Sequence, residues 1–200
     1  MKKLFYAASI TIVSLGACNN SGTDKKEEKK TDVTQLRSAD STANQSTENS
    51  NPASKADISL NQILSSYMQM KNAFAKDNDK DAATAGEVMV KAFAGFNKAG
   101  LHAEQSKLYD DLEGDAKEHA EHISVNKGNI KHQREHFDML SKDIYQLVKT
   151  FGAGYIVYYD HCPMYNNGKG ASWLSESKEI HNPYLGRSMP TCGSVKEELK

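Results

Sequence analysis

Two short stretches near the end of the chain carry side chains that could bind a metal ion. The stretch "HCPM" starts at residue 161, "MPTC" starts at residue 189, and one further histidine lies between them. Thiolate and thioether sulfur are soft donors that favour Cu(I), and imidazole binds both copper and zinc. If the two stretches fold together, they form a soft-metal site, with copper as the expected ion. The candidate ligands are His161, Cys162, Met164, His181, Met189 and Cys192.

The same two cysteines also predict a disulfide bond. The chain has three cysteines, and the first of them, Cys18, has a separate predicted role described below. In an exported protein the remaining pair, Cys162 and Cys192, would meet an oxidising compartment. A bond between them would close a loop of about 30 residues and stabilise the fold by about 3.5 kcal/mol in a chain-entropy estimate. The sequence leaves ligation and disulfide formation open.

Two further pairs of histidines lie at helical spacing. His119 and His122 are three residues apart, and His132 and His136 are four residues apart, so each pair shares one helix face. The second pair flanks the polar stretch 133–135, which favours a solvated face. His119 falls on an apolar stripe, which favours a hydrogen-bonded core histidine. A four-histidine site between the two helices is the less favoured alternative.

The sequence lacks the usual motifs of enzymes and of nucleic-acid-binding proteins. It contains no GxxxxGK[ST], GxGxxG, GxSxG, HExxH or CxxC motif. No base is visibly paired with either cysteine, which argues against a thiol enzyme. With 25 basic and 26 acidic side chains, the chain has no overall positive charge to attract nucleic acid. We therefore expect a protein that is not an enzyme and has no nucleic-acid partner.

The first residues resemble a bacterial lipoprotein signal. Lys2 and Lys3 precede an apolar stretch at 4–15, and "LGAC" ends at Cys18. This resemblance to a lipobox implies that residues 1–17 are a signal peptide and that Cys18 is lipidated. The protein would then be anchored to a bacterial membrane outside the cytoplasm, facing the periplasm or on the cell surface. A plain secretory signal or an uncut signal anchor is the alternative.

A polar segment separates this signal from the folded part of the chain. Residues 18–56 are rich in Ser, Thr, Asn, Lys and Glu and contain no aromatic residue. Such a segment cannot bury enough apolar surface to offset the entropy lost on ordering, so it is predicted to be a disordered tether. The folded domain is expected over residues 57–200.

Apolar residues at three- and four-residue spacing predict four amphipathic helices in this domain. The first is expected to begin at a capping box at Ser59, the second to run from about Asp79 to Gly100, the third to surround residues 108–123, and the fourth to cover residues 130–151. The alternating aspartates in "KDNDKD" fail the calcium-loop pattern and are expected to cap the second helix. Short connections between the helices predict an antiparallel four-helix up-down bundle.

The last part of the chain, residues 155–200, has a different pattern. Side chains alternate over residues 155–160, which predicts one short strand. The remainder is rich in Gly, Asn, Pro and Ser and predicts an irregular, loop-rich lobe with one helical turn near residues 175–180. Trp173 and Leu174 are expected to anchor this C-terminal lobe in the core.

The order of several motifs resembles a bacterial domain family of unknown function, found in envelope lipoproteins and as an extension on periplasmic adaptors of copper and silver efflux pumps. The motifs lie within about residues 58–199 and are "QREHFDMLS", "HCPM", "WLS", "EIHNPYLGRSM" and "TCG". The resemblance implies heavy-metal handling outside the cytoplasm, with Cys162, Met164, Met189 and Cys192 as candidate ligands. The chain lacks the long coiled-coil hairpin and β-rich domains of those adaptors, so it is not expected to be an adaptor itself.

The expected function is that of a lipid-anchored accessory protein that binds a soft metal ion, with copper expected, and passes it to an efflux or sensor protein of the envelope. The alternative is a helical interaction domain that is stapled by a Cys162–Cys192 disulfide, docks another envelope protein and binds no metal.

Overall fold

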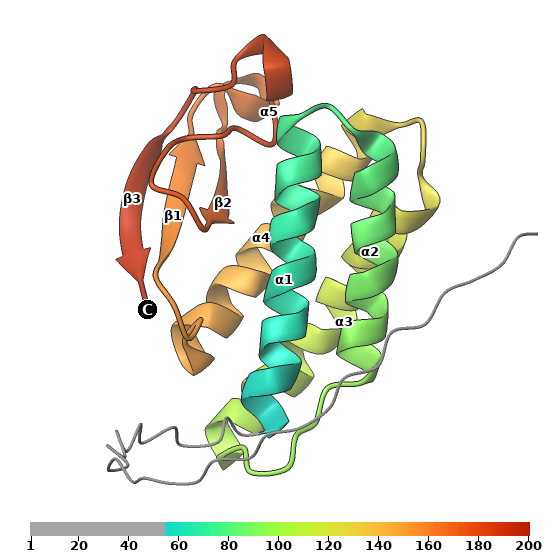
Figure 1. Cartoon of the computed structure of the whole chain (residues 1–200), viewed down its shortest axis with the longest axis vertical. Helices are drawn as coiled ribbons and strands as arrows, with labels where there is room; N and C mark the ends of the chain where they lie inside the picture. The colour runs from blue at the N-terminus through green and yellow to red at the C-terminus, as the bar shows by residue number, and fades with distance from the viewer. Residues whose placement is uncertain (1–54) are drawn as a thin grey trace, which may run out of the picture. The chain divides into compact units, whose positions relative to one another are not determined.

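The computed structural model describes residues 55–200, and the predicted signal peptide, Cys18 and residues 19–54 of the predicted tether lie outside them. The described part is mainly helical, with four long helices (Figure 1). These are α1 (Lys55–Ala75), α2 (Asp79–Ala94), α3 (Ala103–Val125) and α4 (Ile130–Phe151). Among residues 55–200, no helix combines the length and the apolar character needed to cross a membrane.

Each long helix packs against the next one in the chain, so α2 lies beside α1, α3 beside α2, and α4 beside α3. The apolar stripes face inward, as their spacing predicts. Helices α1 and α4 meet through an aromatic contact: the rings of Tyr67 on α1 and Phe137 on α4 stack with centroids 5.1 Å apart. The hydroxyl of Tyr67 also lies 2.7 Å from that of Ser141 on α4.

Helix ends differ from the sequence prediction in two places. Ser59 is not an N-cap, because α1 already begins at Lys55; its hydroxyl instead accepts a hydrogen bond of 3.2 Å from the amide of Asn97, beyond the end of α2. Helix α2 ends at Ala94 with Gly95 as its C-cap, five residues before the expected Gly100. The segment "KDNDKD" caps α2 as expected, but the capping residue is Asn78 and not one of the aspartates: its side chain accepts the amide hydrogen of Asp81.

The C-terminal lobe holds a three-stranded antiparallel sheet rather than one strand. Its strands are β1 (Val157–Cys162), β2 (Ala171–Ser175) and β3 (Ser194–Leu199), in the order β2-β1-β3. The expected helical turn near residues 175–180 is wrong; short helical turns form instead at α5 (Tyr165–Gly168) and η1 (Gly186–Ser188). β2 packs on α4 and α1, which buries Trp173 and Leu174 completely and confirms them as anchors.

Candidate metal centre

The hairpin of α3 and α4 brings four histidines together. The turn at residues 126–129 joins the helices, which run side by side in opposite directions. His122 lies four residues before Asn126, and His132 lies three residues after Asn129. His119 and His136 each lie seven residues from the same turn. Equal distances along two antiparallel helices place residues at the same height, so the four rings form two facing pairs.

The four rings are close enough to form one cluster, which we call the imidazole cluster (His119, His122, His132 and His136). The Nδ1 atoms of His119 and His136 lie 3.2 Å apart, so one donates a hydrogen bond to the other. The rings of His122 and His136 stack in parallel with centroids 4.1 Å apart. His132 lies 4.6 Å from His136 by ring centroids. One ring nitrogen from each of His122, His132 and His136 lies within 4.8 Å of the other two.

Buried hydrogen bonds hold the hairpin in register beside this cluster. The side-chain nitrogen of Gln133, which is fully buried, donates to the carbonyl of Ile123 at 2.9 Å and to the carbonyl of Asp79 at 3.1 Å. The Asp79 carboxylate accepts the amide hydrogen of Gly128 at 2.6 Å. Because Gln133 points inward, its neighbour His132 and the next turn's His136 are directed toward α3.

The surroundings of two of these histidines, His119 and His136, suppress their protonation. Burial and the neighbouring imidazoles His122, His132 and His119 lower the pKa of His136 to about 4. Burial is also the main cause of a lowered pKa at His119. A neutral imidazole has a free lone pair, and metal ligation requires that form. These two rings are therefore ready to act as ligands at neutral pH.

Two carboxylates lie next to the outer rings. Glu118 approaches Nε2 of His122 at 3.7 Å, and Glu135 approaches Nδ1 of His132 at 3.5 Å. Metal-binding histidines commonly direct their second ring nitrogen at such a group, which fixes the tautomer and ring orientation. The same arrangement leaves Nδ1 of His122 and Nε2 of His132 for an ion.

The cluster has the donor chemistry for a borderline divalent ion. Imidazole nitrogen suits Zn²⁺ and Cu²⁺, and zinc–nitrogen bonds of about 2.0–2.1 Å place two ligand nitrogens roughly 3.3 Å apart. The pair of His119 and His136 already has that spacing, whereas the stacked ring of His122 must rotate to aim a nitrogen at the same ion. The side chains of His122 and His132 are 43% and 34% exposed, so an ion can reach them from solvent.

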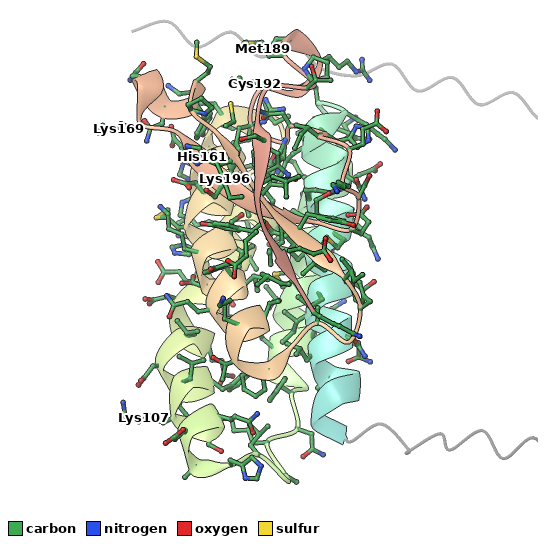
Figure 2. The ribbon with its side chains drawn as sticks, turned by 90° about the vertical axis from the view of Figure 1, so that its left-hand side faces the viewer. Lys107, His161, Lys169, Met189, Cys192 and Lys196 are labelled. Atoms are coloured by element: carbon green, nitrogen blue, oxygen red, sulfur yellow. The ribbon has the colours of Figure 1, made fainter. Side chains whose placement is uncertain are left out.

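The structure brings together the two cysteines proposed from the sequence. The sulfur atoms of Cys162 and Cys192 lie 2.7 Å apart, at the same end of the C-terminal lobe as Met189 (Figure 2). The methionine side chains are directed outward, with Met164 59% and Met189 43% exposed. His161 lies with its Nδ1 3.0 Å from the Ser172 hydroxyl. The sixth candidate, His181, is exposed, with its Nε2 3.7 Å from the carboxylate of Glu179.

The sequence interpretation underrated the histidines. His132 and His136 lie on a face that is only partly exposed, and both rings contact a histidine ring of α3. His119 is hydrogen-bonded as expected, but it is half-buried and its partner is a second histidine. The signal that could have found the cluster is the near-equal distance of the four histidines from the turn at 126–129.

The described part of the chain is thus a mainly helical domain with a small C-terminal sheet, and it carries four histidines on one helical hairpin. Residues 63–155 match the model of a family described as "Protein of unknown function (DUF3347)". The matched part includes the whole imidazole cluster and stops just before β1. Searches of curated proteins and of solved structures find no match to the chain.

Proposed function

We propose that this chain is a metal-binding accessory protein of the bacterial cell envelope and that the imidazole cluster is its ion site. The observation that supports the proposal is the meeting of four histidines from two helices, with the ring nitrogens of three of them within 4.8 Å of one another. Among residues 55–200, no other group of three or more His, Cys, Asp or Glu side chains has this proximity.

The fold suits such a site. We infer that the four long helices form an antiparallel four-helix bundle, a frame in which metal sites are built from side chains on facing helices. Here the ligands come from α3 and α4, whose register is held by buried hydrogen bonds of Gln133. Nitrogen donors favour Cu²⁺ or Zn²⁺, and copper agrees with the resemblance to domains attached to efflux adaptors.

The proposed location rests on the resemblance of the N-terminal sequence to a lipoprotein signal. Lipidation at Cys18 and a tether of about 39 residues would keep the domain near a membrane while letting it reach partners. An open site with half-exposed ligands suits an ion that must be passed on. We therefore propose that the protein binds the ion outside the cytoplasm and delivers it to an efflux or sensor protein.

The cluster is a better candidate than the sulfur ligands proposed from the sequence. Two thiolates bound to one tetrahedral zinc ion, each about 2.3 Å from it, would be roughly 3.8 Å apart. The sulfur atoms of Cys162 and Cys192 lie much closer, at 2.7 Å, and both nearby methionines face outward.

Metal titration of purified protein tests the proposal. Cu²⁺ and Zn²⁺ affinities are measured by competition with a chromogenic chelator for the wild type and for H122Q, H136Q and the matched control H181Q. Removal of a group that hydrogen-bonds to a metal ligand typically weakens metal binding by about 10–100-fold. Loss of the ligand itself should cost at least as much, so we expect H122Q and H136Q to weaken binding by at least about tenfold. H181Q should bind like the wild type.

The spectrum of the copper complex gives an independent readout. Nitrogen hyperfine splitting from imidazole should appear in the electron paramagnetic resonance spectrum of the Cu²⁺-loaded wild type and should change in H136Q. Unchanged affinity and spectrum in both cluster variants would remove the cluster as the ion site. Loss of binding in H181Q instead would favour a site in the C-terminal lobe.

A further inference from the structure

The two cysteines of the C-terminal lobe meet through positions that the fold fixes independently. Cys162 is the last residue of β1 and is fully buried, while Cys192 lies just before β3 and is partly exposed. Their sulfur atoms lie 2.7 Å apart, although 30 residues separate them in the chain. Neither is bonded to another cysteine in the structure.

Several hydrogen bonds hold the Cys192 side of this contact. Its carbonyl accepts the side-chain amide of Asn182 at 2.6 Å, and its amide donates to the carbonyl of Met189 at 3.2 Å. Its sulfur accepts the amide hydrogen of Met164, in the turn that follows Cys162. The next residue, Gly193, lies against the Trp173 ring, where an added Cβ would be only 2.9 Å from the ring. The backbone around Cys192 is thus held in place without a covalent bond.

We propose that Cys162 and Cys192 form a disulfide bond in the mature protein and that this bond closes the C-terminal lobe. The inference is independent of the metal proposal. It assigns the two sulfurs a structural role, because the nearby Met164 and Met189 face solvent and supply no further donor to the contact.

The reaction requires a disulfide donor, which can be a small molecule or a protein. The partly exposed Cys192 loses its proton and, as the thiolate, attacks one sulfur of the donor, and a mixed disulfide forms as the first donor thiol leaves. The Cys162 sulfur then attacks the sulfur of Cys192 and releases the second donor thiol. Two protein thiols become one disulfide, and the donor disulfide becomes two thiols. Because Cys162 is buried, Cys192 is the thiol that reacts first with the donor.

The closed segment covers part of the core. Between the two cysteines, the buried ring of Tyr184 packs 5.6 Å from Phe137 of α4, and its hydroxyl donates to the carbonyl of Ser172 at 2.6 Å. Arg134 of α4 donates to the carbonyl of Pro183 at 2.7 Å. A covalent closure would keep this segment on the core when its exposed parts move.

Non-reducing peptide mapping tests the bond on full-length protein purified from membranes without reductant, after rapid alkylation of free thiols. Trypsin should yield residues 150–169 joined to residues 188–196, with a mass two hydrogens below the sum of the two peptides. Reduction should separate them and expose two new thiols. The variants C162S and C192S should lose the joined peptide. Recovery of both wild-type peptides in alkylated form would overturn the proposal.

Limited proteolysis of the folded protein provides a second measurement. Lys178 and Arg187 are exposed and lie between the two cysteines, so trypsin can cut there. The two fragments of a domain cut at either residue should stay joined on a non-reducing denaturing gel and separate after reduction. C192S should separate without reduction. Separation of the unreduced wild type would contradict the proposal, and protection of both thiols from alkylation by added Zn²⁺, which has no redox chemistry, would favour metal ligation.

Discussion

Gly86 on α2 lies so close to α3 that a Cβ at this position would be 2.8 Å from the carbonyl oxygen of Ala120. Ser124, one turn further along α3, would be 3.2 Å away through its amide nitrogen. Backbone atoms cannot withdraw as a flexible side chain can, so only glycine permits this approach. Ala120 follows His119 directly, and the contact therefore helps to fix the helix that carries half of the imidazole cluster.

Replacing Gly86 with alanine should force α2 and α3 apart. Overpacking of this kind costs about 1–3 kcal/mol, and we expect that loss in the free energy of unfolding measured with urea. The matched control is G114A, because a Cβ at Gly114 of α3 would meet nothing within 4 Å. There the better helix propensity of alanine should stabilise by up to about 1 kcal/mol. Equal effects of the two variants would show that the close approach is unimportant.

A second prediction concerns Gln133, whose side chain joins α4 to the end of α3. Q133M retains the volume but leaves the carbonyls of Ile123 and Asp79 without this buried donor. We expect a loss of about 1–3 kcal/mol in the free energy of unfolding, together with weaker metal binding. The exposed Gln146, on the same helix, supplies the control Q146M, which should change neither quantity. Normal metal affinity in Q133M would indicate that the cluster does not depend on this register.

The helices could be predicted from the sequence because their signal is local. Positions such as Phe137 and Ile144 recur at helical spacing, and that period alone identifies α4 and its buried face. Strand β3 has no such local signal because its pairing partner, β1, is distant in the chain. Strand β2 lies close to its partner β1, but the burial of its five residues does not alternate and so gives no strand period. Strand β3 reads "SVKEEL", which is charged, and it becomes a strand only beside β1.

The candidate site shows the same limit. The spacing of His132 and His136 placed them on one helix face, but the polar residues between them suggested that this face meets water. Whether this face meets water depends on the position of the partner helix, α3. Contacts such as the hydrogen bond from Gln133 to Ile123, which joins the two helices across the turn, fix that position. The meeting of Cys162 and Cys192 likewise depends on the pairing of β1 with β3, which no local pattern reveals.

Acid should destabilise the protein through the imidazole cluster. His136 has a pKa of about 4 in the folded protein because of burial and neighbouring imidazoles, against an ordinary value of 6.5. Between these values the unfolded chain binds the proton more tightly, so stability rises with pH from about 4 to 6.5 and is fully present above 6.5. H136Q should lose this part of the pH dependence, measured as urea midpoints with a metal chelator present. The exposed His181 provides the control H181Q, and an identical slope in H136Q and wild type would contradict the assignment.

Asp160 should contribute a pH dependence of the opposite sign. It is fully buried, both of its carboxylate oxygens lack a hydrogen-bond partner, and burial raises its pKa to about 7 despite the attraction of Lys71. The folded state therefore holds this proton more tightly than the unfolded chain does. The resulting contribution of Asp160 to the free energy of unfolding is fully present below about pH 4 and is lost as pH rises toward 7. D160N cannot ionise, and it should flatten this slope and be more stable than the wild type at pH 8.

The fluorescence of Trp173 should report the ionisation of Asp160 directly. It is the chain's only tryptophan, it pairs with Asp160 across β1 and β2, and its indole nitrogen is buried without a hydrogen-bond partner. A charge that appears beside a buried indole should shift its fluorescence, so the emission of the wild type should change with a midpoint near pH 7. In D160N the emission should stay constant over the same range. A flat wild-type curve, or the same transition in D160N, would show that Asp160 is not the titrating group, because the two residues are fully buried and directly opposite each other on paired strands.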